Sequence, residues 1–309
     1  MTRAPLNPAI PTLDGVGPSC VALPAGPWAT VLDFLAERLP IVSREGWAQR
    51  KARGRVLDDQ AQPLPTDAPY RHPTRLYYYR EVDGEPPVPE SETVLFQDDW
   101  LVVADKPHHM AVVPGGRYVA GSLLVRLKRR LGLDTLSPLH RIDRETAGLV
   151  VFAVQPHTRA AYQALFRDRL VHKRYEAVAP WRPDLALPHT HHSRLEPVPG
   201  FFTQQEVAGE PNSETRLSLL EHNATHARYA LEPTTGRRHQ LRAHLNALGA
   251  PIVGDRFYPL VMPADLPDDH RQPLQLLARA LRFTDPFTGQ QRHFESRRQL
   301  LALDALTPP

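Results

Sequence analysis

The chain has 309 residues, a hydrophobic content of 41% and a formal net charge of +3 at pH 7. Its length allows one large domain or a medium domain with a small one, and its weak net charge excludes a histone-like polycation, so nucleic-acid contacts must come from local basic patches. The single cysteine, Cys20, excludes a disulfide framework or a cysteine-based zinc site within one chain. Without an apolar run of membrane-spanning length or a signal-like start, a cytoplasmic protein is expected.

The N-terminal part of the sequence predicts a small folded unit between two irregular segments. Residues 1–27 are rich in Pro and Gly without periodicity, so we expect a flexible arm there. Residues 83–92, DGEPPVPESE, are Pro-rich and acidic, which is typical of a linker. Residues 28–82 are expected to form the small unit, and residues 93–309 the main domain.

The small unit begins with two predicted helices followed by strand-like residues. Apolar residues at helical spacing in TVLDFLAERLP predict the first helix. The second is expected between Ser43, which suits an N-cap, and Gly54, which suits a C-terminal stop. This second helix is strongly basic and includes Arg50, Lys51 and Arg53.

The sequence of the main domain predicts more strands than helices. Strands are expected at TVLFQ, WLVVADK, GLVVFAV and HKRYEAVAP, while TRLSLLEHN and THARYALEP alternate as half-buried antiparallel strands do. Helices are expected at GSLLVRLKRRLG, PHTRAAYQALFRDRL and GRRHQLRAHLNALG, and the Pro- and His-rich residues 183–212 are expected to form a loop. Because strands outnumber helices in a mixed order, an α+β fold is favoured over a doubly wound sheet.

The stretch HRIDRETAG places Asp143 between Arg141 and Arg144, just before a strand predicted to lie in the core. Arginine and aspartate residues grouped in this way most often form a salt-bridge cluster on the protein surface. Loops on rigid scaffolds are also where catalytic groups concentrate, and an ionised carboxylate can act as a nucleophile or a base, but not as a general acid. Asp143 is therefore a candidate catalytic residue.

In GRRHQLRAHLNALG, leucines at i, i+4 and i+7 predict a helix face that packs inward, and Gly249 predicts its end. Arg238 and Arg242 are also four residues apart and share another face. Either this is a basic helix on the surface, or Arg242 pairs with Asp143 across a cleft and orients it. The spacing does not choose between these alternatives.

Tyr175 lies at the start of the predicted strand HKRYEAVAP, directly after a basic pair. A strand tyrosine usually packs into the core. It can also offer an aromatic face to an unstacked nucleobase, so Tyr175 is a second candidate site residue.

Histidines suggest a metal site at two places, and both are weak candidates. His189, His191 and His192 have no acid or cysteine near them in the sequence, which favours a solvated loop. His239 and His244 are five residues apart, whereas the histidines of zinc-binding helices are four apart. We therefore expect neither a metal nor a cofactor.

Four stretches together resemble the motifs of the RluA family of RNA pseudouridine synthases. They are LVVADKP, HRIDRETAGLVVFA, HKRYEAV and GRRHQLRAHLNALGAPIVGDRFYP, and their order and spacing also match across residues 93–297. The stretch LDFLAERLP and the residues after it resemble the small RNA-binding domain that often precedes this catalytic domain. The chain departs from the family pattern at Ala147, where the family has serine, and at His108 and His109, where a small residue and a glycine are common.

The resemblance implies a pseudouridine synthase fold: a mixed, mostly antiparallel sheet with flanking helices and a central active-site cleft, preceded by a small α/β RNA-binding unit. It also implies a reaction, without cofactor or metal, that breaks the bond from ribose to uracil N1, turns the base and rejoins the ribose to carbon 5. Asp143 would attack or deprotonate the ribose, with Arg242 as its ion-pair partner. Tyr175 would stack on the uracil, and Arg141 would fill the gap left by the flipped nucleotide. The other implied RNA-binding residues are His140, Arg144, Lys173, Arg238, His239, Gln240, Arg50, Lys51 and Arg53.

The expected partner is a structured RNA, either ribosomal large-subunit RNA or tRNA. We expect no DNA or membrane partner, and a chain that acts as a monomer. A non-catalytic RNA-binding or chaperone protein is the alternative, although a pure binder gains nothing from an anion near phosphates. A glycosidase of small nucleosides usually needs two carboxylates, and no second carboxylate stands out near a motif.

Overall fold

The computed structural model describes residues 10–82, 84–263 and 266–306, and the chain divides into two compact units. The smaller unit comprises the chain up to Pro86 together with Pro114–Ala120 and Val125–Asp134, and the larger unit comprises Pro87–Val113, Gly121–Leu124 and Thr135–Pro309. Within the described residues, no helix is both long and apolar enough to cross a bilayer.

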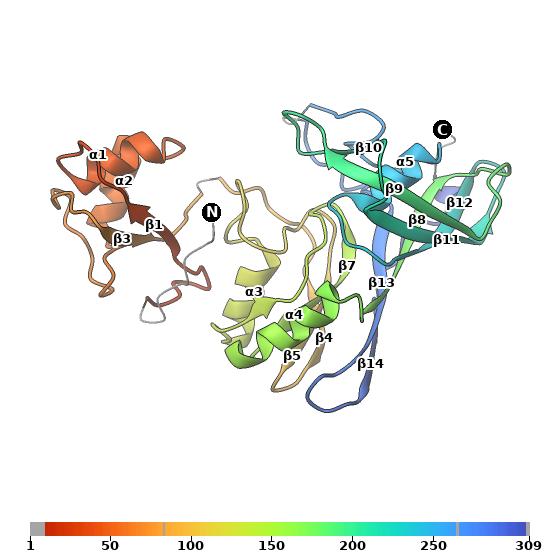
Figure 1. Ribbon diagram of the computed structural model, residues 1–309, viewed down its shortest axis with the longest axis horizontal. Coiled ribbons are helices and arrows are strands. Elements are labelled where there is room, and N and C mark those ends of the chain that lie inside the picture. Colours follow the sequence, from red (N-terminus) through yellow and green to blue (C-terminus); the bar gives the residue numbers. More distant parts are fainter. Residues whose placement is uncertain (1–9, 83, 264–265, 307–309) are drawn as a thin grey trace. The chain divides into compact units, whose positions relative to one another are not determined.

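The smaller unit contains two helices and a three-stranded sheet. Its elements are β1 (Ser19–Leu23), α1 (Val31–Arg38), α2 (Arg44–Ala52), β2 (Val56–Leu57) and β3 (Thr74–Tyr78). The strands pair in the antiparallel order β1-β3-β2 (Figure 1), and Phe34 and Trp47 from the two helices are buried in the core. Ser43 caps α2 as expected, since its Oγ accepts a hydrogen bond from the Gly46 amide. The smaller unit therefore combines helices and strands, and its bounds are wider than the expected residues 28–82.

The expectation of a flexible arm over residues 1–27 is wrong for the part that the structure describes. Residues 1–9 lie outside the described residues, but β1 pairs along its length with β3, with Val21 opposite Leu76. Leu23 at the end of β1 is buried. The surrounding Pro and Gly residues concealed this strand, because a short strand depends on its partner's hydrogen bonds and packing more than on its own composition.

The segment 83–92, expected to be a linker, is anchored near its start. The Glu85 carboxylate accepts hydrogen bonds at 2.8 Å from the backbone amides of Val119 and Ala120. The boundary between the two units is not a single position in the sequence before residue 93. Part of the chain after residue 113 belongs to the smaller unit.

The larger unit is built on one mixed sheet. From residue 93 onward the elements are β4 (Thr93–Gln97), β5 (Leu101–Lys106), α3 (Leu123–Leu131), β6 (Ser137–Pro138), β7 (Ala147–Ala153), a 3-10 turn (Pro156–Thr158), α4 (Arg159–Arg167), β8 (His172–Pro180), β9 (His189–Pro197), β10 (Gln204–Val207), β11 (Ser213–His222), β12 (His226–Pro233), α5 (Gln240–Ala247), β13 (Leu276–Thr284), β14 (Gln291–Glu295) and a second 3-10 turn (Leu303–Ala305). The strand order is β10-β9-β11-β12-β8-β13-β7-β5-β4, with β14 on β13 and β6 on β7. Only the β7–β13 pair is parallel among the described strands, so the expected α+β fold with a mostly antiparallel sheet is confirmed.

The segment 183–212 is not the loop that its composition suggests. It contains β9 and β10, and β9 pairs with β11 so that Ser193 lies opposite Ser213. Along β9, Ser193 and Leu195 are buried while their neighbours are more exposed, as in a half-buried strand. Proline and histidine concealed these strands near the sheet edge, where proline is tolerated.

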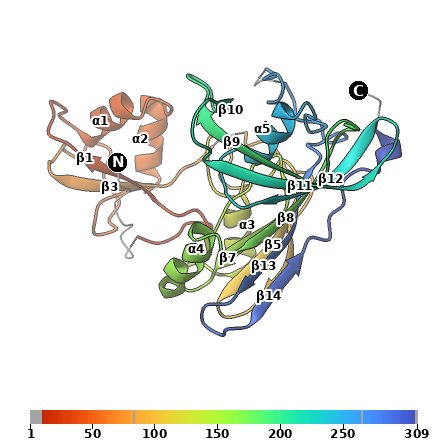
Figure 2. The same ribbon diagram turned by 45° about the vertical axis from the view of Figure 1, so that its right-hand side comes forward.

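Two helices pack on this sheet at different places. Tyr162 of α4 packs against Leu149 and Val151 of β7, whereas Leu241 and Leu245 of α5 pack against β8, β11 and β12. Figures 1 and 2 show α4 beside β5 and β7, and α5 beside β9. The leucine face predicted for α5 therefore packs inward as expected.

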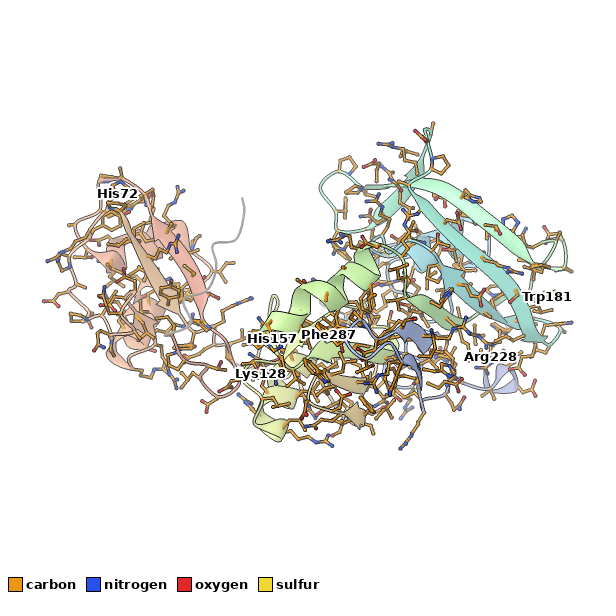
Figure 3. All side chains as sticks on the ribbon, turned by 60° about the horizontal axis from the view of Figure 1, so that its bottom comes forward. His72, Lys128, His157, Trp181, Arg228 and Phe287 are labelled. Carbon is orange, nitrogen blue, oxygen red and sulfur yellow. The ribbon has the colours of Figure 1, made fainter. Side chains whose placement is uncertain are left out.

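An aromatic contact joins the start of α4 to the β13–β14 turn. The ring of Trp100 stacks on Phe287 with centroids 5.3 Å apart and meets His157 edge-on at 6.0 Å. Figure 3 labels His157 and Phe287 close to each other in the larger unit. Aromatic contacts of this kind add to the stability that apolar burial supplies.

Gly148 allows β7 and β13 to approach each other. It has φ +111°, and a Cβ there would clash with the Ala278 backbone, lying 2.7 Å from its N. We expect Gly148→Ala to lower the free energy of unfolding by at least about 2 kcal/mol, measured by chemical denaturation. Gly289→Ala is the matched control, since it has φ +69° but nothing within 4 Å, and it should cost only about 1–2 kcal/mol. An equal effect of both substitutions would contradict the backbone clash.

Candidate active site

Asp143 lies in the loop that leads into β7, a central strand of the larger unit's sheet. Every residue of β7 is buried. The Thr146 amide donates a hydrogen bond to the Asp143 carbonyl at 3.2 Å and closes a turn just before this strand. The Asp143 side chain, 28% exposed, lies in the wall of a cavity of about 650 Å³. A rigid strand thus positions an accessible carboxylate.

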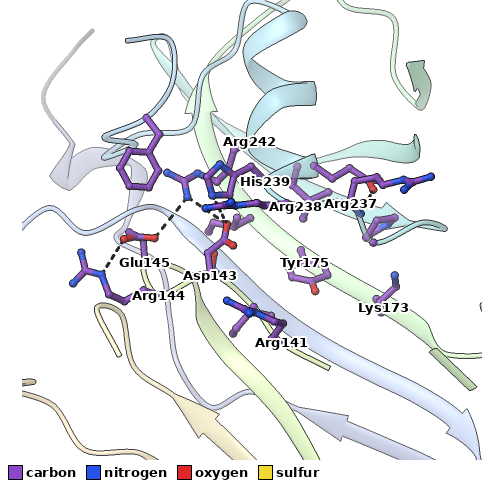
Figure 4. Close-up of a pocket in the computed structure, with 18 of the residues that line it drawn as sticks. Arg141, Asp143, Arg144, Glu145, Lys173, Tyr175, Arg237, Arg238, His239 and Arg242 are labelled. Atoms are coloured by element: carbon purple, nitrogen blue, oxygen red, sulfur yellow. Dashed lines mark hydrogen bonds and ion pairs between the residues drawn. The ribbon is translucent and has the colours of Figure 1, made fainter. Parts of the chain in front are cut away.

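Arg242 reaches the same cavity from α5. The residue before this helix, His239, adopts a left-handed conformation with φ 52°. The Arg242 side chain is 1% exposed, and its Nη1 lies 3.3 Å from Asp143 Oδ2 (Figure 4). The expected ion pair is therefore confirmed, although 99 positions separate the two residues.

Asp255 is a closer partner of Arg242 that sequence reasoning missed. Arg242 Nε and Nη2 donate to the two Asp255 oxygens at 2.8 and 2.5 Å, and the Asp255 side chain is fully buried. Glu145 Oε2 lies 3.7 Å from Arg242 Nη1. Burial opposes the charge, but Asp255 and the nearby carboxylates of Asp143 and Glu145 raise the pKa of Arg242 above its usual value. The bidentate pair fixes the guanidinium plane and directs Nη1 toward Asp143.

Gly254 allows the backbone turn that positions Asp255. Gly254 has φ +75°, and a Cβ there would lie 2.5 Å from the Pro273 carbonyl oxygen. The backbone then turns through a hydrogen bond from the Asp255 amide to the Ile252 carbonyl at 3.1 Å. The signal was the Gly-Asp pair in GAPIVGD, but a motif does not by itself say which side chain the aspartate meets.

The loop around Asp143 is held from β5 and the residues after it. Lys106 Nζ donates to the Arg144 carbonyl at 3.1 Å, and His108 Nδ1 donates to the Glu145 carbonyl at 2.6 Å. Burial lowers the pKa of Lys106 to about 7 and that of His108 to about 4, so His108 is neutral at pH 7. The departure from the family pattern at His108 thus provides a structural contact to the loop that carries Asp143.

The other departure, Ala147, is fully buried at the start of β7. Val178 and Leu277 belong to the same apolar cluster. A hydroxyl group here would need a buried hydrogen-bond partner, so alanine suits the position.

Arg144 lines the same cavity and also holds the loop around Asp143. Its Nη1 and Nη2 donate to Asp268 at 2.7 and 2.8 Å, and its Nε donates to Glu145 at 3.0 Å. The hydrogen bond from Arg144 is the main cause that lowers the pKa of Asp268 to about 2. With two carboxylates bound, the guanidinium positions Glu145 beside Arg242.

Tyr175 and Lys173, two residues apart on β8, line the same cavity as Asp143. Tyr175 is half-buried against the apolar cluster under α5, and burial and the charge of Asp143 raise the pKa of its hydroxyl. Arg141 is exposed and also lines this cavity. Figure 4 shows these side chains around one space with Arg242. The four residues expected to act on the uridine therefore line the same cavity; they are Asp143, Arg242, Tyr175 and Arg141.

His140 does not face the cavity, and its expected RNA contact is corrected. Its ring stacks on Phe166 with centroids 4.6 Å apart, and its Nε2 accepts a hydrogen bond from the Val151 amide. Burial lowers the pKa of His140 to about 3. A neutral histidine with these contacts anchors the loop to β7 and α4.

Gln240 and His239, which were expected to bind RNA, both line the cavity but are largely buried in its wall. The Gln240 side chain is held by hydrogen bonds, among them one from Thr235 Oγ1 at 2.7 Å. The His239 ring stacks on Phe257, and its Nε2 lies 3.9 Å from Asp143 Oδ2. Burial is the main cause that lowers the pKa of His239 to about 3. His239 is therefore a neutral residue in the cavity wall. Arg242, and not His239, places a positive charge beside Asp143.

The basic residues of α2 differ in exposure. Lys51 is 3% exposed, burial lowers its pKa, and its Nζ has no hydrogen-bond partner among the described residues, so its expected RNA contact is corrected. Arg50 donates to the Glu81 carbonyl at 2.7 Å. Arg53, with 58% of its side chain exposed, is 3.8 Å from the Glu81 carboxylate.

The hairpin β9–β10 brings together three groups that can ligate a metal. Donor atoms of His191 on β9, Glu206 on β10 and His244 on α5 lie within 4.8 Å of one another, and the expected solvated loop is wrong because His189, His191 and His192 lie in a strand. Hydrogen bonds already occupy this group: His191 pairs with Glu206 at 2.7 Å, while the two His244 ring nitrogens meet Thr215 and Ser213 at 2.9 and 3.0 Å. The three side chains therefore already belong to a hydrogen-bonded polar network.

We expect Lys173 to make RNA binding dependent on pH. Burial lowers its pKa to about 8, and its Nζ donates to the Thr235 carbonyl at 2.8 Å. The ammonium group is therefore charged at pH 7 and largely neutral at pH 9. We expect RNA affinity to fall by about tenfold between these values, as for loss of one charge-assisted hydrogen bond. In filter-binding titrations, Lys173→Arg should retain its affinity at pH 9, and an equal fall in both proteins would contradict this role.

Comparisons with known proteins identify the family. The family model described as RNA pseudouridylate synthase matches residues 100–247. An uncharacterised RNA pseudouridine synthase of Synechocystis sp. is 31% identical over 232 residues, covering 74% of this chain and 79% of that protein. The dual-specificity RNA pseudouridine synthase RluA of Haemophilus influenzae is 31% identical over 238 residues, covering 70% of this chain and 97% of that protein.

Solved structures agree on the fold. Human RNA pseudouridylate synthase domain containing 1 has a TM-score of 0.57 at 23% identity, covering 72% of this chain and 89% of that one. Human RNA pseudouridylate synthase domain containing 4 has a TM-score of 0.52 at 25% identity, covering 67% and 88%. The chain belongs to the RNA pseudouridine synthases of the RluA type. It is thus an RNA-modifying isomerase, as its motifs indicated.

Proposed function

We propose that this chain converts specific uridines of a structured RNA to pseudouridine, with Asp143 as the catalytic carboxylate. The observation that carries this proposal is the state of that carboxylate: it opens into a cavity of about 650 Å³, while its partner Arg242 is buried and held by Asp255. A carboxylate that opens into a cavity and is oriented by a buried arginine suits a nucleophile or a base.

The reaction rearranges one nucleoside. The bond between ribose carbon 1′ and uracil N1 breaks, the base turns, and carbon 1′ bonds to uracil carbon 5. The hydrogen on carbon 5 is lost and N1 gains one, so substrate and product are isomers. Asp143 acts on the ribose, either by attack or by removing a proton, and Arg242 orients it. The Tyr175 ring supports the base in the cavity.

RNA contacts follow from the exposed cations around the cavity. Arg141 and Arg238 are exposed and Lys173 lies deeper, and all three line the cavity. Arg141 takes the place of the flipped uridine, which offsets part of an unstacking cost of a few kcal/mol. In the smaller unit, Arg50 of α2 and Arg53, directly after this helix, are the proposed contacts.

Several finer features belong to the same proposal. The substrate is ribosomal large-subunit RNA or tRNA, the chain acts as a monomer in the cytoplasm, and neither DNA nor a membrane is a partner. Recognition of local folded shape by phosphate and base contacts supports an RNA substrate. No described feature favours the non-catalytic alternative, because an accessible anion beside phosphates weakens a binder.

A pseudouridine map of cellular RNA tests the proposal. Carbodiimide modification and sequencing would compare cells with the gene, cells without it, and cells without it that express the chain again. We expect discrete pseudouridines to vanish with the gene and to return on re-expression, which would also name the RNA. An unchanged map would refute the proposed activity.

A further inference from the structure

A second hollow adjoins the active-site cavity at the β9–β10 hairpin. Its volume is about 620 Å³, and Phe202, Arg237 and Arg238 line both spaces. The rest of its wall comes chiefly from the end of β9 and the turn into β10. When a uridine of an RNA occupies the first cavity, the adjoining part of the RNA can therefore run either along this hollow or away from it.

The hairpin that forms this wall is held in place. The Val198 amide donates to the Thr203 carbonyl and the Phe201 amide donates to the Val198 carbonyl, each at 3.0 Å. At the start of β10, the buried Tyr258 hydroxyl accepts from the Gln204 amide at 2.8 Å and donates to the Gln204 carbonyl at 3.0 Å. Because Tyr258 follows Asp255 closely in the chain, the hairpin is tied to the segment that holds Arg242.

Two aromatic rings at the turn are left open to solvent. Phe201 is 60% exposed and Phe202 is 39% exposed. The Arg238 guanidinium lies over the Phe202 ring, 5.6 Å from its centroid. Phe201 is thus an exposed ring on an ordered turn beside a polar hollow, which is the surface that bases of single-stranded RNA stack on.

The charges around the hollow suit a phosphate. Arg194, Arg237 and Arg238 contribute three positive charges to its wall and Glu196 one negative charge. Arg194 and Glu196 pair at 2.8 Å, and Arg237 Nε donates to the Asn212 carbonyl at 3.2 Å. The surplus is positive, and arginine beside an aromatic ring is typical of sites for unstacked nucleotides.

We propose that this hollow, here called the hairpin subsite and defined by Phe201, Arg194 and Arg237, binds a nucleotide next to the target uridine. The base stacks on Phe201, and its phosphate meets Arg194 and Arg237. The subsite rests on the proposed function, because it assigns to the hairpin the binding of a nucleotide beside the modified uridine. It also explains why the segment 183–212 forms ordered strands next to the active site.

The test is a coupling experiment between protein and RNA. RNA crosslinked in cells to the Asp143→Asn protein would be trimmed to a short segment around its crosslinked uridine. Each neighbouring base would then be replaced in turn by an abasic nucleotide, and dissociation constants measured in the Asp143→Asn background with and without Phe201→Ala. We expect Phe201→Ala to weaken binding by about tenfold, as for one lost base stack. It should have no further effect when one particular neighbour is abasic.

Controls separate stacking from structure and from catalysis. Leu220→Ala removes an exposed apolar side chain, 40% exposed, that lines neither space, and should bind normally, while Phe201→Tyr should restore binding. Wild-type affinity of Phe201→Ala, or a loss equal at every abasic position, would overturn the subsite. Pseudouridine formation by the wild-type chain is read separately, so a missing reaction would refute the proposed function without deciding the stacking result.

Discussion

Asp143→Asn is expected to abolish pseudouridine formation while RNA binding is retained. Asparagine keeps the size of the side chain but cannot attack the ribose or remove a proton from it. The single-turnover rate constant should fall by at least about 10²-fold and up to about 10⁴-fold. Binding should hold or tighten, because the substitution removes an anion from a cavity lined by Arg141 and Lys173.

The measurement uses purified proteins and the RNA named by the cellular map, with pseudouridine read by carbodiimide-blocked primer extension. Asp184→Asn is the matched control: this aspartate is 63% exposed and pairs with Arg182 away from the cavity. We expect the control to react at the wild-type rate. Wild-type activity of Asp143→Asn would show that another group performs the chemistry.

Arg242→Leu is expected to destabilise the fold as well as remove activity. The guanidinium is 1% exposed and the Asp255 side chain 0% exposed, so the substitution leaves a buried carboxylate without its cation. Removal of one member of a buried ion pair typically costs about 3–5 kcal/mol. The free energy of unfolding of the larger unit, followed by denaturant titration, should fall by about this amount.

A double substitution tests this reason. Arg242→Leu with Asp255→Leu removes both buried charges and should recover part of the lost stability, since an apolar pair often replaces a buried ion pair without loss. It should remain inactive, because Asp143 loses its orienting partner. Arg216→Leu, an exposed arginine on β11 that lines neither cavity, is the control and should change stability by less than about 0.5 kcal/mol. No recovery in the double variant would argue against an unpaired Asp255 as the cause.

Local chemistry made several elements predictable. The apolar run that forms β7 and the leucine face of α5 follow their periodicity, and the predicted caps at Ser43 and Gly249 mark real helix boundaries. These features depend on neighbours within one or two turns of chain. β1, β9 and β10 were missed because their pairing partners, and not their own composition, make them strands.

The site shows the same division. Asp143, Arg242 and Tyr175 could be named from motifs, and the structure places all three at one cavity. Motif neighbours were less informative: His140 lies outside the cavity and bonds to β7, while Arg144 and Gln240 line the cavity but are also bonded to the protein's own groups. Whether a polar side chain faces RNA or the core depends on the three-dimensional environment, which a linear motif does not record.

The sequence by itself determined the fold class and the family and named Asp143 as the candidate carboxylate, because these rest on periodicity and on motif residues in fixed order. Only the tertiary structure decided that Asp255 holds Arg242, that His239 is a neutral wall, and that Phe201 stands exposed beside the active site. The physical reason is distance along the chain. Ion pairs and burial join residues that are far apart in sequence, and their energies depend on solvent exclusion that only the folded sheet and its helices create.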